Sequence, residues 1–325
     1  MTVTPLSVAE VAAHGRAVLD EVATVVVGMR EPLETALAAV LAGGHVLFED
    51  VPGLGKTLAA RSLATALGLE FRRVQCTPDL LPSDITGSSV FDPATTRFQF
   101  RPGPVFAGLL LADEINRTAP KTQSALLEAM AERQVTVDGT TYPLPDPFHV
   151  VATSNPVEYE GTYPLPEAQL DRFMVRLAVG YPEPAAEVDV LARRLARRQE
   201  VATVRTVVDA ATLLRMQAGV EAVDVDDDIL RYCVDLAAAT RAEEAVDIGA
   251  SPRGSQALVV VARALAVLHG RDFVTPEDVK AVAHAALDHR VTVRPELWMS
   301  QVTGHSVVAE ILSVVPAPDA GSALP

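Results

Sequence analysis

The sequence is poor in cysteine and in long apolar runs, and each shortage excludes a class of protein. Its only cysteines are Cys76 and Cys233, and their spacing fits neither a metal motif nor a disulfide framework. We expect both to be reduced thiols in the core. The histidines His284 and His289 are five residues apart and do not share a helix face, so they predict no metal site. The longest apolar stretch, 36–48, is interrupted by two glycines and a histidine, which makes it too short to span a bilayer.

Targeting signals and positive charge are also scarce. The first fifteen residues lack the basic start and apolar centre of a signal peptide, which predicts a cytoplasmic protein without membrane insertion. The 27 Lys and Arg residues are outnumbered by 42 Asp and Glu, for a formal net charge of −15. Such a charge repels phosphate backbones, so we expect no strong nucleic-acid binding.

Apolar residues are plentiful, at 49% of 325 positions, which suits one large or two ordinary globular domains. Short apolar runs alternate with helical periodicities as far as the Pro/Gly-containing segment 180–184, and beyond it the pattern is almost wholly helical. This order predicts an α/β fold: a doubly wound parallel sheet core in residues 1–180 and a C-terminal all-helical domain in residues 181–325.

The individual elements follow from periodicity and turn residues. Strands are predicted at 46–48, 71–76, 108–111, 148–153 and 174–179. Helices are predicted at 7–29, 31–41, 58–67, 121–133, 185–199, 209–220, 226–245, 254–269, 276–289 and 306–314. Two hairpins are expected, one at 88–100 and one at 134–142 around Asp138-Gly139, a dipeptide that favours a tight type I′ turn.

A phosphate-binding loop is predicted between the first strand and the next helix, in the sequence VLFEDVPGLGKT. Gly53 and Gly55 would let backbone N–H groups converge on a phosphate at a helix N-terminus. Lys56 would reach the terminal phosphates and Thr57 would ligate Mg²⁺. Asp50 stands where the usual pattern has its first glycine, so a surface turn is the alternative. The flanking strand and helix favour a nucleotide site.

Two carboxylates follow the apolar strand at 108–111. Asp113 and Glu114 would emerge at the carboxyl end of that strand, where open α/β sheets bind their ligands. Asp113 would hold Mg²⁺ through water, and Glu114 would act as the base that polarises the attacking water. A solvated strand end is the alternative, which the upstream phosphate loop disfavours.

Three further polar residues are candidates from their positions. Asn155 ends the strand next to the one that bears Asp113, where it could position the water or form a turn before the following proline. Arg172 precedes the last strand and could clamp a phosphoryl group or pair with its aspartate neighbour. Arg253 opens a helix of the second domain and could reach the nucleotide or be a surface charge.

These stretches together resemble the MoxR family of AAA+ ATPases, in the helix-2-insert clade. The similar segments are EDVPGLGKT at 49–57, QCTPDLLPSDITG at 75–87, DEINR at 113–117, ATSNP at 152–156 and QLDRF at 169–173. The resemblance extends from about Val27 over nearly the whole chain. An aspartate at position 50 is usual in this family.

The resemblance implies an AAA+ core with a helical lid, and roles for single residues. Lys56 and Thr57 become Walker A, Asp113 and Glu114 Walker B, Asn155 sensor 1, Arg172 an arginine finger acting on a neighbouring subunit, and Arg253 sensor 2. The implied nucleotide contacts, with the first two beside the adenine, are Val27, Gly28, Asp50, Pro52, Gly53, Leu54, Gly55, Lys56, Thr57 and Leu58.

The resemblance also implies a function. It predicts a homo-hexameric ATPase that uses ATP and Mg²⁺ to remodel or mature other proteins, often metal enzymes. The implied partners are a von Willebrand A domain protein and a client protein that the sequence does not name. The alternatives are a nucleic-acid motor or chelatase-type motor subunit and an inert nucleotide-binding scaffold. The two hairpins, which would face a central pore, contain only Arg97 as a basic residue up to Phe100, and this disfavours a DNA motor.

Overall fold

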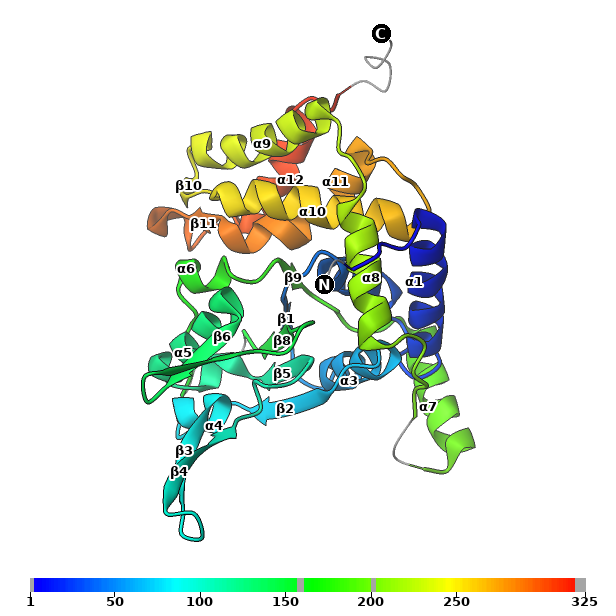
Figure 1. Ribbon diagram of the computed structural model, residues 1–325. Coiled ribbons are helices and arrows are strands. Elements are labelled where there is room, and N and C mark those ends of the chain that lie inside the picture. The colour runs from blue at the N-terminus through cyan, green and yellow to red at the C-terminus, as the bar shows by residue number, and fades with distance from the viewer. Residues whose placement is uncertain (1–2, 157–160, 200–202, 319–325) are drawn as a thin grey trace.

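The computed structural model describes residues 3–156, 161–199 and 203–318. Its centre is a five-stranded parallel sheet with the strand order β2-β5-β8-β1-β9 (Figure 1). The strands are β1 (Val46–Glu49), β2 (Phe71–Gln75), β5 (Leu109–Asp113), β8 (His149–Ser154) and β9 (Val175–Leu177). The predicted α/β class is confirmed, and so is the adjacency of the strands that lead to Asp113 and Asn155.

The sheet separates two hydrophobic clusters, which explains why the central residues of its inner strands are apolar on both faces. In β5, Leu109 and Leu111 belong to the larger cluster, whereas Leu110 and Ala112 belong to the smaller one. Successive side chains of a strand point to opposite faces, so helices must cover both faces of the sheet. Every residue of β5 and β8 is buried as a result. The strand ends are thereby held in one fixed register.

Helices of the N-terminal half surround this sheet. They are α1 (Val8–Ala23), α2 (Arg30–Leu41), α3 (Lys56–Ala66), α4 (Pro82–Thr86), η1 (Ile115–Arg117), α5 (Pro120–Glu132) and α6 (Glu167–Leu170). The first helix was predicted to run to residue 29, and this is wrong. It ends at Ala23, because the C-cap residue Thr24 donates its hydroxyl to the Glu21 carbonyl at 2.6 Å and Gly28 has a positive φ of 75° that a helix does not allow.

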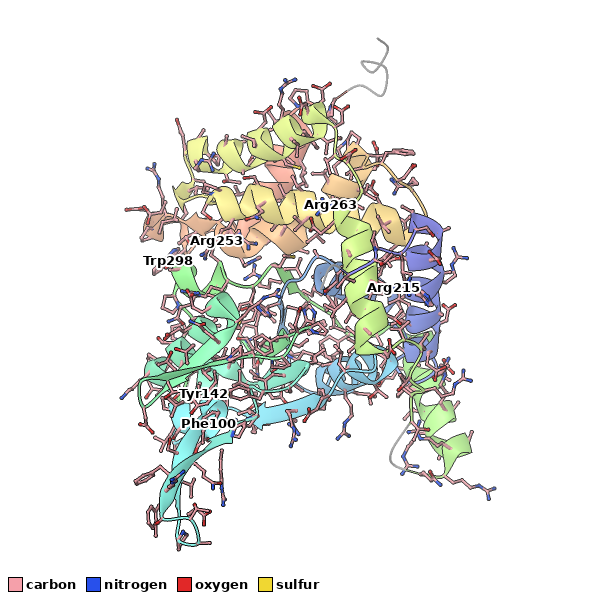
Figure 2. The ribbon with its side chains drawn as sticks, in the orientation of Figure 1. Phe100, Tyr142, Arg215, Arg253, Arg263 and Trp298 are labelled. Atoms are coloured by element: carbon pink, nitrogen blue, oxygen red, sulfur yellow. The ribbon has the colours of Figure 1, made fainter. Side chains whose placement is uncertain are left out.

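Two antiparallel hairpins extend from the core, as predicted. They are β3 (Gly87–Asp92) with β4 (Arg97–Pro102) and β6 (Gln134–Val137) with β7 (Thr140–Pro143). Asp138 and Gly139 have φ values of 49° and 76°, as a type I′ turn requires. Phe100 and Tyr142 stack with ring centroids 4.0 Å apart, which joins the two hairpins (Figure 2).

The C-terminal half consists mainly of helices (Figure 1). They are α7 (Pro184–Arg197), α8 (Ala210–Glu221), α9 (Asp227–Ala242), α10 (Pro252–Leu268), α11 (Pro276–Leu287), η2 (Asp288–Arg290), η3 (Pro295–Leu297) and α12 (Gly304–Val314). The expectation that this half is all-helical is wrong in one detail, because β10 (Val246–Ile248) pairs with β11 (Thr292–Val293). The larger hydrophobic cluster includes residues of α1, α2 and α10, so apolar packing crosses the predicted 180/181 boundary, which stays a prediction.

Two buried histidines stand at the starts of neighbouring strands. The His45 Nδ1 accepts the Val150 N–H at 2.9 Å, so its Nε2 donates to the Met130 carbonyl at 3.3 Å. The His149 Nδ1 lies 2.9 Å from the Gly44 carbonyl and donates to it. Burial lowers the pKa of His45 to about 3 and the pKa of His149 to about 4. Both rings are therefore neutral parts of the core.

Cys76 and Cys233 are free, buried thiols, as predicted. Burial raises the pKa of each to about 12, so neither is a reactive thiolate. Within the described ranges, none of the helices combines the length and the apolar character that crossing a membrane requires.

Candidate functional site

The predicted phosphate loop lies between β1 and α3, at the carboxyl edge of the sheet. Gly53 and Gly55 have φ values of 85° and 83°, a conformation that favours glycine. A Cβ atom built on either glycine would meet nothing within 4 Å. The loop is therefore an open cradle with the N-terminus of α3 directly behind it, and such a cradle suits an anion.

The ammonium group of Lys56 is directed at this edge of the sheet. Its Nζ donates to the Asp50 carbonyl at 2.5 Å and lies 3.5 Å from the Ser154 carbonyl. Burial lowers the pKa of Lys56, while the carboxylates of Asp50 and Asp113 oppose that shift. Both of these hydrogen-bond partners are carbonyl oxygens, so the ammonium group can turn toward an anionic ligand that enters the loop.

Asp113 is the centre of the polar contacts in the site. Its Oδ2 accepts the Thr57 hydroxyl at 3.1 Å, and its Oδ1 accepts the Thr153 hydroxyl at 2.6 Å. The guanidinium of Arg73 forms two bonds to the same Oδ2, at 3.0 and 2.7 Å. A hydroxyl and a carboxylate side by side are oxygen ligands of the type that Mg²⁺ prefers, so the residues present fit a magnesium nucleotide.

Glu114 follows Asp113 in a left-handed backbone conformation, with φ 59° and ψ 51°. Its N–H donates to the Thr153 hydroxyl at 2.8 Å, which ties the backbone after β5 to β8. Its carboxylate accepts the Gln75 amide at 2.8 Å and the Arg117 guanidinium at 3.1 Å. A non-glycine residue in this conformation is often part of a functional site.

Asn155 is buried at the end of β8, with 4% of its surface exposed. Its backbone carbonyl accepts the Asn116 amide at 3.1 Å, so the DEINR segment after β5 fixes the backbone at Asn155. The two neighbouring strand ends are held together in this way.

A cavity of about 250 Å³ brings these groups together. Its wall consists of Pro52, Gly53, Gly55, Lys56, Thr57, Arg73, Asp113, Glu114, Thr153, Ser154 and Asn155. Pockets that bury a whole drug-sized ligand are roughly 300–1,000 Å³, so this cavity has the size for the phosphate end of a nucleotide. Phosphoryl transfer to water uses a lysine, a hydroxyl, two carboxylates and an amide around one site, and this cavity contains all of them.

The remaining predicted contacts lie outside this cavity wall, as far as the described residues define it. They are Val27, Gly28, Asp50, Leu54 and Leu58. The Asp50 carboxylate accepts the N–H groups of Val179 and Gly180 at 2.7 and 2.6 Å. Gly28 lies against Pro182 and Ala186, since a Cβ on Gly28 would meet their side chains at 3.7 and 3.5 Å.

Arg172 and Arg253 are not brought to the phosphate cavity. Both line a second cavity of about 380 Å³ together with Asp171 and Arg290. Arg172 donates to the Leu127 carbonyl at 3.2 Å, and Arg253 lies 3.8 Å from Asp171 with 57% of its side chain exposed (Figure 2). Arg253 therefore does not contact the Lys56 cavity of its own chain.

Sequence patterns missed four residues of the phosphate cavity and its margin: Arg73, Gln75, Thr153 and Ser154. Arg73 and Gln75 are two residues apart on β2, so they share one face, and the Arg73 guanidinium also donates to the Gln75 amide oxygen at 2.7 Å. Their role depends on β2 lying next to β5, which becomes known only with the strand order.

Comparison with known proteins agrees with this geometry. Residues 45–175 match the model of the ATPase family associated with various cellular activities (AAA), and residues 238–311 match the AAA lid domain. The chain is 49% identical to the uncharacterized protein YeaC of Bacillus subtilis, over 95% of this chain and 96% of that protein. It is 40% identical to the chaperone MoxR1 of Mycobacterium tuberculosis, over 95% and 84%. A crystal structure of a putative ATPase from Cytophaga hutchinsonii superposes with a TM-score of 0.89 at 40% identity, over 96% and 97% of the two chains.

Proposed function

The chain belongs to the MoxR family of AAA+ ATPases, and we propose that it hydrolyses ATP to ADP and phosphate in order to remodel partner proteins. The observation that supports this best is the single cavity that Lys56, Thr57, Asp113 and Glu114 share. Lys56 binds the terminal phosphates, and Thr57 with Asp113 holds Mg²⁺. The bound Mg²⁺ would supply charge neutralisation at the phosphates.

The protein's own groups then act on the attacking water. Asn155 orients the water, and Glu114 takes its proton as the general base. Gln75 and Arg117, which contact the Glu114 carboxylate at 2.8 and 3.1 Å, orient that carboxylate. Val27 and Gly28 lie beside the adenine. Gly28 packs against Pro182, which belongs to the segment between β9 and α7.

Arg172 acts as an arginine finger on the site of a neighbouring subunit in a homo-hexamer, and Arg253 acts as sensor 2 from the lid. The cavity that Arg172 lines is separate from the phosphate cavity of its own chain, which supports action of Arg172 in trans. Arginine suits this task because its charge is permanent and its donors are forked. A head-to-tail ring would repeat such an interface at every subunit.

A protein client is favoured over nucleic acid as the substrate of this motor. Phe91 and Phe98 near the tip of the β3–β4 hairpin are 49% and 72% exposed, and they contact each other edge to face with centroids 5.5 Å apart. An exposed aromatic pair offers apolar surface to a polypeptide, whereas a formal net charge of −15 disfavours nucleic acid. A von Willebrand A domain protein is the proposed partner, and metal-enzyme maturation is one candidate pathway.

Substitutions at the phosphate cavity test the ATPase proposal. Lys56→Ala is expected to abolish nucleotide binding, whereas Glu114→Gln is expected to keep binding and lose hydrolysis. The matched controls are Lys121→Ala and Glu128→Gln, which remove the same charges from exposed positions of α5. Equal loss of binding in both cavity variants would assign Glu114 a structural role instead. Proteins that co-purify with tagged Glu114→Gln in the presence of ATP would then identify the client.

A further inference from the structure

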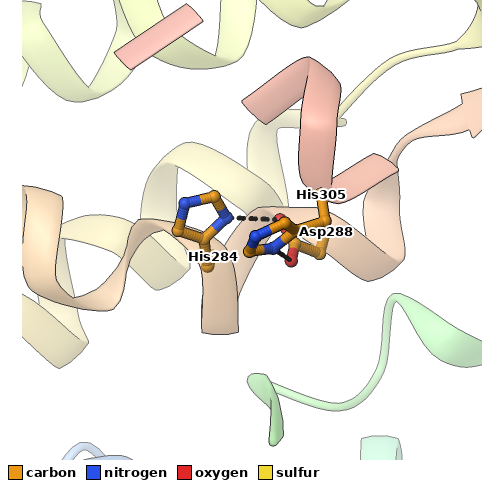
Figure 3. Close-up of side chains that lie close together, drawn as sticks. All are labelled: His284, Asp288 and His305. Carbon is orange, nitrogen blue, oxygen red and sulfur yellow. Dashed lines mark hydrogen bonds and ion pairs between the residues drawn. The ribbon is translucent and has the colours of Figure 1, made fainter. Parts of the chain in front are cut away.

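Three potential metal ligands meet in the C-terminal half, far from the phosphate cavity in the sequence. His284 lies in the last turn of α11, Asp288 begins η2 one helical turn later, and His305 comes from the first turn of α12 (Figure 3). The His284 Nδ1 is 3.0 Å from Asp288 Oδ1, and the His305 Nδ1 is 2.9 Å from Asp288 Oδ2. Two imidazoles therefore face the two oxygens of one carboxylate.

The geometry of this His-Asp-His cluster is close to that of a metal centre. One ligand atom of each residue lies within 4.8 Å of the ligand atoms of the other two. Bonds of about 2.0–2.2 Å in the tetrahedral geometry of Zn²⁺ sites place ligand atoms roughly 3.3–3.6 Å apart. The two Nδ1 atoms lie 3.0 and 2.9 Å from oxygens of the same carboxylate, so side-chain rotations can bring the three ligand atoms around one ion. The rings are already nearly stacked, with centroids 4.1 Å apart and planes 30° from parallel.

Accessibility and anchoring are combined in the cluster. The Asp288 side chain is 12% exposed, whereas the His305 side chain is 67% exposed, so an ion can enter from the solvent toward a nearly buried carboxylate. The close fit of Gly304 holds α12 in place, because a Cβ at that position would lie 2.6 Å from the Asp288 carbonyl oxygen. His289, the other histidine of this region, instead has its Nε2 3.1 Å from the Phe173 carbonyl, so His305 completes the set.

We propose that His284, Asp288 and His305 bind a divalent first-row transition ion, with Zn²⁺ as the reference ion. A donor set of two imidazoles and one carboxylate binds Zn²⁺, Co²⁺ or Ni²⁺ in preference to Mg²⁺ or Ca²⁺. Coordination through the two Nδ1 atoms replaces their hydrogen bonds to Asp288 and leaves the proton of each neutral ring on Nε2. A bound ion would link the end of α11 to the start of α12. The three side chains line a cavity of about 450 Å³ together with Glu49 and Arg176.

Zinc binding to the full chain tests this site without any measurement of ATPase activity. The chain is freed of purification tags, stripped of metal and dialysed against Zn²⁺ with excess Mg²⁺ and no nucleotide. We expect one Zn²⁺ per chain, with a raised melting temperature. His284→Ala and His305→Ala should each weaken binding at least about tenfold, because loss of even an outer partner of a metal ligand costs 10–100-fold.

His269→Ala is the matched control, because His269 also faces a carboxylate, Glu34 at 3.3 Å, but lies outside the cluster. It should bind Zn²⁺ like the wild type. His305→Ala is the most informative variant, since its exposed side chain can be removed with the fold intact, as circular dichroism would verify. Unchanged zinc affinity in both cluster variants, or the absence of zinc binding by the wild type, would overturn the proposal. Affinity that falls in the cluster variants alone would support it.

Discussion

Mild acid is expected to destabilise this protein through His45 and His149. Each ring is neutral and uses one nitrogen as a donor, while the His45 Nδ1 accepts the Val150 N–H. A second proton on that ring would place two N–H groups against each other in a buried site. The folded-state pKa values, about 3 for His45 and about 4 for His149, lie below the ordinary value of 6.5.

The sign and size of the effect follow from these values. The unfolded chain binds the protons first as pH falls, so the stabilisation is complete above about pH 6.5 and is lost toward pH 3. A pH of 5 is 1.5 units below the unfolded-state pKa of about 6.5. At 1.36 kcal/mol per unit, each histidine then lowers the free energy of unfolding by about 2 kcal/mol. The pair then accounts for about 4 kcal/mol, against a total of roughly 5–15 kcal/mol for a typical protein. Both folded pKa values lie below pH 5, so the result depends mainly on the unfolded state.

Urea unfolding at about pH 7.5 and pH 5 measures this difference in the free energy of unfolding. His45→Asn and His149→Gln should each reduce the difference between the two pH values by about 2 kcal/mol, whatever their stability at pH 7.5. Leu47→Ala, a buried apolar position of β1, is the control. It should lower stability equally at both pH values. A wild type equally stable at both pH values, or variants that keep the full difference, would refute the reasoning.

Three further predictions concern the ring, the core and nucleic acid. Arg172→Ala should bind ATP but hydrolyse it slowly. Mixing it with Glu114→Gln should restore part of the activity, since about a quarter of random head-to-tail interfaces keep both an intact Glu114 and an intact Arg172. No recovery after proven subunit exchange would contradict the role of Arg172 in trans. Asp171→Ala should cost about 3 kcal/mol in urea unfolding, because Arg290 is 3% exposed and loses its carboxylate, whereas exposed Asp146→Ala should cost little. DNA binding measured at physiological salt should be weaker than about 10⁻⁶ M, and a tighter complex that stimulates ATP hydrolysis would favour the motor alternative.

Local signals predicted most of the fold. Asp138-Gly139 was sufficient for its hairpin, because a type I′ turn needs residues that tolerate positive φ. The strands β5 and β8 were found from apolar runs, since strands buried on both faces have few polar side chains to obscure them. The β10–β11 pair was missed because it joins segments of three and two residues that are separated by the 43 residues 249–291. Such short strands leave no periodicity to detect.

The site was predictable where its residues lie together in the sequence, and less so where the fold joins them. Lys56 and Thr57 are adjacent in one motif, and Asp113 follows an apolar run. Arg73 contacts Asp113 only because β2 pairs with β5, and a polar residue on a strand gives no sign of that contact. The position of Arg253 could not be predicted for the same reason, because it depends on how the C-terminal helices pack against residues 171–174.

Asp50 has a consequence for how binding in the loop reaches the rest of the chain. Its backbone carbonyl accepts the Lys56 ammonium, while its carboxylate accepts the N–H groups of Val179 and Gly180. A ligand that draws the Lys56 ammonium toward itself therefore also acts, through Asp50, on the segment 179–183 that leads into α7. The aspartate at the position of the usual glycine thus connects the phosphate loop, through its backbone carbonyl and its carboxylate, to the start of the C-terminal half. A glycine at this position would keep the carbonyl that accepts Lys56 but would lose the carboxylate that binds Val179 and Gly180.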